Sequence, residues 1–168
     1  MSQAAYWQIF MFSVFLLPFI LGGIHAAIIK KKTKYRITHI LLCYCTFIYI
    51  GFEATFFGLN QIFQGEAVAQ FIGWKWSPFV REVGMANLSY GILGLLSFWR
   101  RDAFRVATVL GSSMFLLFAY IGHLYDIITT GNFNPGNAGV ILYTDIFIPI
   151  IFAVLLIMNY RAKKKQII

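Results

Sequence analysis

The sequence predicts an all-α protein, a polytopic transmembrane helical bundle of about five spans that forms one domain over residues 1–168. Hydrophobic residues make up 60% of the chain and charged residues only 12%, about half the share found in soluble domains. Several apolar segments are long enough to cross the roughly 30 Å hydrocarbon layer of a bilayer. The links between them are too short to fold alone, so no separate soluble domain is expected.

The first two predicted spans cover residues 6–29 and 37–59. Tyr6 and Trp7 begin the first span as interfacial aromatics, and a run of lysines follows its other end. The start, MSQAAYWQ, lacks the basic region of a signal peptide, so this segment is expected to remain as a span. In the second span, polar residues recur at helical spacing from His39 to Glu53, which indicates a face turned into the bundle.

Residues 60–79 are too polar for a span. Their mixed pattern predicts an amphipathic helix in the membrane interface, ended by Gly73 and anchored by Trp74 and Trp76. Such a segment could act as a flap over a site at that surface. An ordinary connecting loop with interfacial aromatics is the alternative interpretation.

The remaining spans are predicted at residues 78–99, 104–130 and 140–160. Ser77 followed by Pro78 is typical of a helix start. Repeated glycines between residues 84 and 94 predict that this helix packs closely against a neighbour. The link TTGNFNPGNAG, residues 129–139, is rich in Gly, Asn and Pro and predicts a tight, structured turn.

The net charge of +8 comes from basic residues that flank the predicted spans. Twelve of the 14 Lys and Arg fall in three clusters after the first, third and fifth spans: Lys30, Lys31, Lys32, Lys34 and Arg36; Arg100, Arg101 and Arg105; Arg161, Lys163, Lys164 and Lys165. The positive-inside rule then predicts an external N-terminus and a cytoplasmic C-terminus. Membrane lipids are the expected partners of these charges, and nucleic acid is excluded as a partner.

This topology brings ionisable residues of four spans to one level, within roughly 5–10 Å of the outer boundary at 1.5 Å per residue. They are Glu53, Glu82, His123, Asp126 and Asp145, together with Arg81. Four carboxylates beside one fixed cation cannot all stay ionised in a low dielectric, so a proton or a bound cation is expected. The five acidic and imidazole groups are therefore candidate ligands of a divalent metal ion.

The same residues are candidates for acid–base catalysis, with His123 as the acid or base, Asp126 orienting it, and Glu53 as a further buried acid. Side chains expected to contact a ligand are Arg81, Asn87, Tyr90, Tyr125, Trp74 and Trp76, and Tyr143 is a further hydrogen-bonding group expected nearby. Structural interpretations stand beside these. Glu82 can complement the start of its helix, and Arg81 can pair with Asp126 or Asp145.

Several runs together carry a family resemblance: GFEATFFGLNQ, SPFVREVGMANLSYGILGLLSFW, GHLYD, NFNPGNAG and YTDIFIP, which span most of residues 51–149. They resemble a family of small bacterial multi-pass membrane proteins whose domain has no known function. More distantly, the size and glycine-rich helices are similar to DoxX-type membrane proteins, some of which are linked to quinol or thiol oxidation. The resemblance implies the bacterial inner (plasma) membrane and supplies no mechanism.

The sequence thus favours an integral membrane protein with an outward-facing carboxylate and histidine site for a metal ion or a lipid-soluble ligand, such as a quinone or isoprenoid. Whether the protein is an enzyme stays open. The alternatives are a non-catalytic subunit of a larger membrane redox complex and a small transporter. A homo-oligomer is a further expectation.

Overall fold

The computed structural model describes residues 3–100 and 102–167, and their regular structure is helical throughout. Residues 1–2, Arg101 of the second predicted basic cluster, and Ile168 lie outside the described residues. The elements are α1 (Gln3–Ile28), α2 (Lys34–Cys45), the π-helix η1 (Thr46–Glu53), α3 (Ala54–Phe63), α4 (Gly65–Ile72), α5 (Pro78–Leu96), α6 (Ala103–Thr130), α7 (Pro135–Ala138) and α8 (Val140–Ile167).

Within the described residues, four helical segments are long and apolar enough to cross a membrane, judged by length and composition. They are Ala4–Ile28, Lys34–Phe63, Ala103–Thr130 and Pro135–Lys165, and they match the first, second, fourth and fifth predicted spans. The predicted third span forms the helix α5, which begins at Pro78 after an extended Ser77. Because α5 is shorter and more polar than the other four, its crossing of the membrane stays a prediction.

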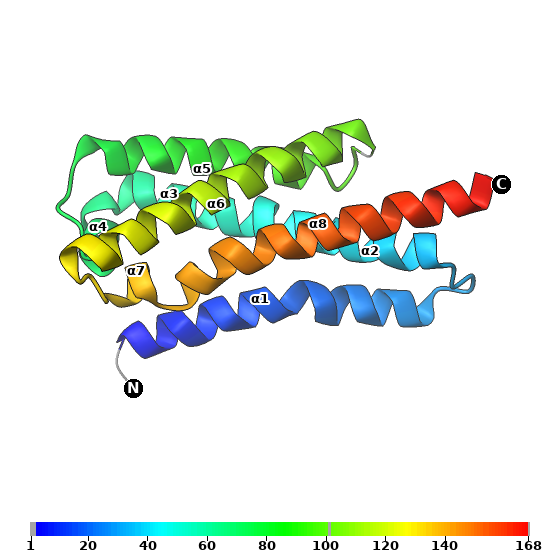
Figure 1. Ribbon diagram of the computed structural model, residues 1–168, viewed down its shortest axis with the longest axis horizontal. Helices are drawn as coiled ribbons and strands as arrows, with labels where there is room; N and C mark the ends of the chain where they lie inside the picture. The colour runs from blue at the N-terminus through cyan, green and yellow to red at the C-terminus, as the bar shows by residue number, and fades with distance from the viewer. Residues whose placement is uncertain (1–2, 101, 168) are drawn as a thin grey trace.

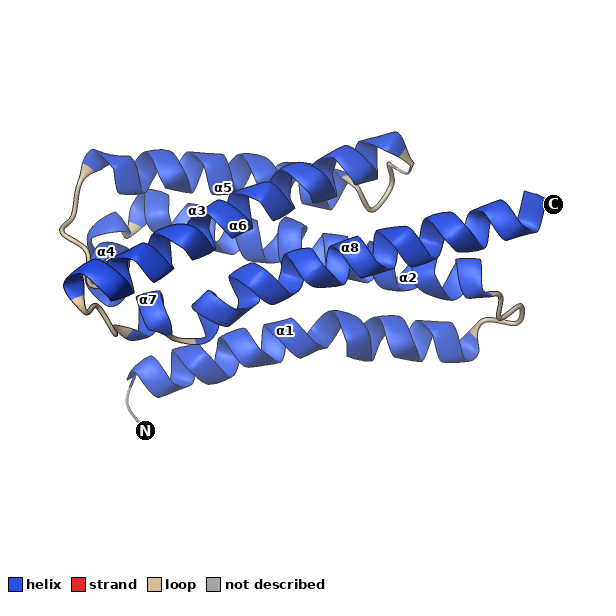
Figure 2. Cartoon of the chain, in the orientation of Figure 1, coloured by secondary structure: helices blue, strands red, loops and turns tan. Residues whose placement is uncertain are grey.

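The long helices run roughly along one axis of the molecule (Figure 1). The short helices α4 and α7 lie at one end, beside the start of α5 and the end of α6; we call this the α4–α7 end. The α1–α2 link, the α5–α6 link and the C-terminal end of α8 lie at the opposite end, which we call the basic end (Figure 2). The described residues of all three basic clusters lie in these links, in the first turns of α2 and α6 that adjoin them, and in the last turns of α8, so they gather at one end.

Helix α5 packs so closely against η1 and α3 that several glycines at the contact leave no room for a side chain. A Cβ atom at Gly58 would lie 2.7 Å from the backbone nitrogen of Leu88, and one at Gly91 would lie 2.7 Å from the backbone nitrogen of Thr55. At Gly94 it would lie 2.6 Å from the carbonyl carbon of Ile50. The predicted close packing through small residues is confirmed.

The predicted polar stripe of the second span turns inward. His39 and Cys43 are half-buried, whereas Thr46, Ile50 and Glu53 are buried. The last three belong to η1, where the backbone adopts the wider π-helical turn. Such turns are rare and frequently occur at functional sites, which directs attention to Glu53 at the end of this segment.

Arg105 is not a surface charge of the second basic cluster, because only 2% of it is exposed. Its Nε and Nη2 atoms donate hydrogen bonds of 3.0 and 2.6 Å to the carbonyl oxygen of Ser97, at the C-terminal end of α5. A guanidinium at that position satisfies helix carbonyls and complements the helix dipole. The structure therefore assigns Arg105 to joining α5 and α6, a role that its place in a basic cluster did not predict.

Candidate functional site

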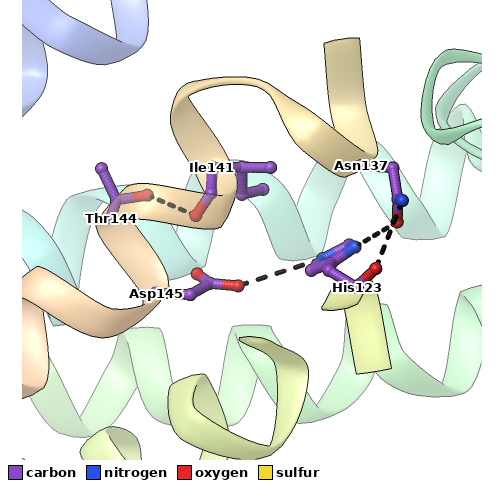
Figure 3. A network of polar contacts seen from close by, with 5 residues as sticks. All are labelled: His123, Asn137, Ile141, Thr144 and Asp145. Atoms are coloured by element: carbon purple, nitrogen blue, oxygen red, sulfur yellow. Dashed lines mark hydrogen bonds and ion pairs between the residues drawn. The ribbon is translucent and has the colours of Figure 1, made fainter. Parts of the chain in front are cut away.

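A buried histidine and a buried asparagine form the centre of the polar layer at the α4–α7 end (Figure 3). His123 lies on α6 and is 7% exposed, and Asn137 lies on the single turn α7 and is 0% exposed. The Nδ1 atom of His123 lies 2.7 Å from the Oδ1 atom of Asn137. The amide nitrogen of Asn137 donates to the carbonyl oxygens of Asn132 and His123, at 2.8 and 3.4 Å.

These contacts determine where His123 carries its proton. Both carbonyl oxygens can only accept, so they fix the amide of Asn137 with its nitrogen toward them and its oxygen toward the imidazole. An amide oxygen can only accept as well, and Nδ1 of His123 must therefore be the protonated nitrogen. Its Nε2 atom is left to accept a proton in the neutral ring, or to donate one in the imidazolium.

The free Nε2 atom faces Asp145 on α8 (Figure 3). It lies 3.9 Å from Oδ2 of Asp145, a residue that is only 5% exposed. This distance is too long for a direct hydrogen bond but short enough for an ion pair. The two groups therefore form a histidine–carboxylate pair whose charge depends on the protonation of Nε2.

Glu53 adds a second acid to this pair from η1. It is 9% exposed and lies close enough to Asp145 for the two carboxyl groups to interact electrostatically. One imidazolium can offset only one of two buried carboxylates, so full neutralisation needs a proton on the other. We refer to His123, Asn137, Asp145 and Glu53 as the His123 cluster.

Trp74 covers one face of the imidazole. The two ring centroids are 5.7 Å apart and their planes differ by 19°. The indole Nε1 of Trp74 donates a 2.9 Å hydrogen bond to Oδ2 of Asp126. Trp74 follows Gly73, whose left-handed backbone (φ +85°) ends α4 as the sequence predicts.

Asp126 does not orient His123, because Asn137 occupies the Nδ1 position. The carboxylate of Asp126 instead accepts hydrogen bonds from Trp74, from Nδ2 of Asn132 at 2.6 Å and from Oγ1 of Thr130 at 2.9 Å. His123 and Asp126 share one helix face as their spacing predicts, yet their hydrogen-bond partners differ. Asp126 positions the indole, and through it acts on the imidazole only indirectly.

The other predicted site residues lie outside the cluster. Arg81 and Glu82 are exposed at the start of α5, and the structure records no ion pair for either among the described residues. Asn87 donates to Oε1 of Gln61 at 2.8 Å, and Tyr90 packs on the ring of Phe115. Two predicted ligand contacts, Tyr125 and Trp76, are 68% and 48% exposed, and Tyr143, which was expected nearby, is 59% exposed.

The predicted five-ligand metal site is not assembled. In the described part of the chain, no group of three or more His, Cys, Asp and Glu side chains is placed to hold a metal ion. The reason is geometric: the helices turn Glu82 to the surface and direct Asp126 to Trp74. Of the five, only Glu53, His123 and Asp145 gather in the buried layer.

Asn137 is the central residue that the sequence reasoning missed. Pro135 begins the one-turn helix α7, and Gly136 packs so closely on Phe71 that a Cβ atom would lie 2.8 Å from its carbonyl oxygen. This contact presses α7 against α4 and points Asn137 inward. The NPGN run signals a tight turn, but it carries no information about which helix that turn faces.

A groove of about 520 Å³ lies beside the cluster, between α1, α3, α4 and α7. Its walls are aromatic and aliphatic, with side-chain amides and no charged group: Ala4, Trp7, Gln8, Met11, Phe56, Phe57, Asn60, Gln64, Ala67, Val68, Gln70, Phe71, Asn134, Pro135 and Ile141. Asn134 and Pro135 line the groove, while Asn137, on the same short helix, contacts His123. Helix α7 therefore connects the groove wall with the His123 cluster.

Comparisons with known proteins place the chain in a family. Neither the curated proteins nor the solved structures include a match to it. One family profile matches residues 8–165, which covers the His123 cluster, three candidate spans in full and the first span from Gln8 onward. The match does not bear on the more distant likeness to DoxX-type proteins. With four candidate membrane-spanning helices, this multi-pass membrane chain belongs to the family of unknown function DUF6790.

Proposed function

We propose that this protein binds an uncharged, lipid-soluble ligand that carries a hydrogen-bond-accepting oxygen, of the quinone or isoprenoid class, at the His123 cluster. The observation that supports this best is the geometry of His123. Its Nδ1 proton is held by Asn137, and its Nε2 atom faces the buried carboxyl group of Asp145. A buried histidine fixed in this way is an adjustable hydrogen-bond donor or acceptor.

The chemistry follows from that arrangement. When Nε2 is protonated, the imidazolium can donate to a ligand carbonyl while the carboxylate of Asp145 offsets its charge. The 3.9 Å separation between Nε2 and Oδ2 leaves both atoms without a direct hydrogen bond to each other. His123 would then act as the acid toward the bound oxygen, and Glu53 would be the second proton-holding group of the site.

The neighbouring groove supports a ligand of this class. It has no charged side chain, which disfavours ions, and its aromatic walls suit a flat or prenylated body. Among the described residues, no side-chain hydrogen bond is recorded for Gln64 or Gln70, which are exposed on this wall. In our proposal the body of the ligand lies in the groove and its polar head lies toward α7.

We further propose that α5 completes five spans, with the N-terminus outside, the C-terminus in the cytoplasm and α4 in the outer interface of a bacterial inner membrane. The gathering of the basic clusters at one end of the bundle supports this orientation. Single cysteines at Glu66 and at Lys164, in a background without Cys43 and Cys45, should react with a membrane-impermeant maleimide from opposite sides of the membrane. Labelling of both from the same side would contradict the odd number of spans.

Binding of a short-chain prenylated benzoquinone to the detergent-purified protein tests the function. The affinity, measured by isothermal titration calorimetry, should fall at least tenfold in His123→Ala and in Asp145→Asn. Two matched controls, His25→Ala at the basic end and Glu82→Gln at the α5 surface, should bind as the wild type does. Equal affinity in wild type and both site variants would reject the proposed site, and an absence of quinone binding would reject this ligand class.

A further inference from the structure

Charge is distributed very unequally between the two ends of the bundle. Of the six acidic residues, five belong to η1, α4, the start of α5, the end of α6 and the start of α8, toward the α4–α7 end: Glu53, Glu66, Glu82, Asp126 and Asp145. Asp102, in the α5–α6 link, is the single acid at the basic end. That end therefore holds a large excess of positive charge.

The single acid at that end is already paired. Lys163 donates a 2.9 Å hydrogen bond to Oδ1 of Asp102 and holds the pKa of that carboxyl below its usual value. The structure records no ion pair for the lysines and the arginine of the first cluster among the described residues. Five cationic side chains within residues 30–36 thus lie together without a recorded carboxylate partner.

A pocket of about 500 Å³ opens beside this cluster, between the end of α1, the first turns of α2 and the residue Phe98 after α5. Arg36, His25 and the phenol of Tyr44 supply polar groups to its lining, and Tyr44 lies 3.3 Å from Nδ1 of His25. Ile29, Ile40 and Phe98 supply an apolar wall. No acidic residue lines it.

We propose that this pocket binds one anionic glycerophospholipid, with its phosphate at Arg36 and His25 and an acyl chain along Ile40 and Phe98. Three features determine this occupant. The cationic rim requires an anion, the apolar wall requires a hydrocarbon chain, and the ends of two apolar helices place the pocket at the depth where lipid head groups lie. A free phosphate would satisfy the first feature alone. The site is separate from the His123 cluster, which lies toward the opposite end of the helices.

Native mass spectrometry of the protein released from nanodiscs tests the proposal. Nanodiscs of phosphatidylcholine containing one fifth phosphatidylglycerol should yield a wild-type protein that retains one phosphatidylglycerol per chain. Arg36→Gln should reduce this retained fraction about fivefold or more. Lys165→Gln removes an equal charge at the same end but outside the pocket, and it should retain the lipid as the wild type does.

Two further variants separate the effect of pocket shape on lipid retention from the effect of charge. Ile40→Trp fills the apolar wall without changing any charge and should also reduce retention, whereas Arg36→Lys should preserve most of it. Circular dichroism and gel filtration of each variant verify the fold. Equal losses in Arg36→Gln and Lys165→Gln would overturn the pocket in favour of general surface attraction. Loss of the bound lipid on adding 10 mM inorganic phosphate would overturn the lipid in favour of a free anion.

Discussion

The imidazole of His123 and the amide of Asn137 are 14 positions apart in the chain and meet at 2.7 Å inside the protein. Because the amide of Asn137 is itself fixed by two backbone carbonyls, this one contact sets both the ring orientation and the proton position of His123. The hydrogen-bonding state of Nε2, the atom that faces Asp145, therefore depends on Asn137.

Asn137→Ala should lower the thermal midpoint of the detergent-solubilised protein more than other asparagine changes do. The substitution leaves the buried Nδ1 proton of His123 and the part-buried carbonyl oxygen of Asn132 without their hydrogen-bond partner. Each unsatisfied buried polar group costs about 1–3 kcal/mol. Asn87→Ala removes one half-buried hydrogen bond to Gln61 and is the control, with a smaller expected loss. Equal losses would contradict the central place of Asn137.

Gly58→Ala should destabilise the bundle strongly. Its new methyl group would meet the backbone of α5, 2.7 Å from Leu88 N and 2.8 Å from Gly84 O, and backbone atoms cannot move aside cheaply. Gly122→Ala, where no atom lies within 4 Å, should be neutral or slightly stabilising, since alanine favours helix by about 0.8–1 kcal/mol. Thermal denaturation of both variants followed by circular dichroism checks the contrast.

Trp74→Ala should expose His123 to modification. The indole covers one face of the imidazole and is itself held by Asp126, so its removal opens that face to reagents. The rate of His123 carbethoxylation by diethyl pyrocarbonate, measured by peptide mass spectrometry, should rise several-fold. Trp76→Ala changes a neighbouring indole that does not stack on His123 and should leave the rate unchanged. Trp74→Phe, which keeps a ring but loses the hydrogen bond, should give an intermediate rate.

Arg105→Ala should weaken the joint between α5 and α6. The buried guanidinium bonds to the carbonyls of Ser97 and Phe98, and hydrogen bonds from charged groups are worth roughly 1.5–3 kcal/mol each. Arg100→Ala removes an exposed arginine from the link between α5 and α6 and should have little effect on the thermal midpoint. A similar small effect in both variants would show that the buried contacts contribute little.

The Asp102–Lys163 pair should stabilise the bundle only when Asp102 is ionised. Lys163 lowers the pKa of Asp102 in the folded protein, so the stabilisation is fully present above the pKa of the unfolded chain, near 4 for an aspartate, and is lost as the pH falls through the lower folded-state value. Asp102→Asn should therefore lower the thermal midpoint slightly at pH 7. The difference from wild type should shrink steadily as the pH falls below about 4. A difference that grows on acidification would contradict this assignment.

The sequence by itself determined the helical segments and much of their local detail. Apolar stretches of sufficient length predicted the four candidate spans, Pro78 and Gly73 marked a helix start and a helix end, and the glycines of α5 predicted its close packing. Each of these properties depends on residues that are neighbours in the chain. Composition, helical spacing and backbone preference are therefore sufficient to find them.

The tertiary structure decided which polar groups meet. Glu53, His123 and Asp145 come from three different segments, and helix rotation alone decides that they gather while Glu82 turns to the surface. Asn137 and Arg105 gained their roles because α7 packs on α4 and α6 packs on the end of α5. The depth of a residue in the membrane can be counted along its own helix. The rotation of a helix about its axis, and the choice of its neighbours, depend on how the side chains of several helices fit together, and no single segment encodes that fit.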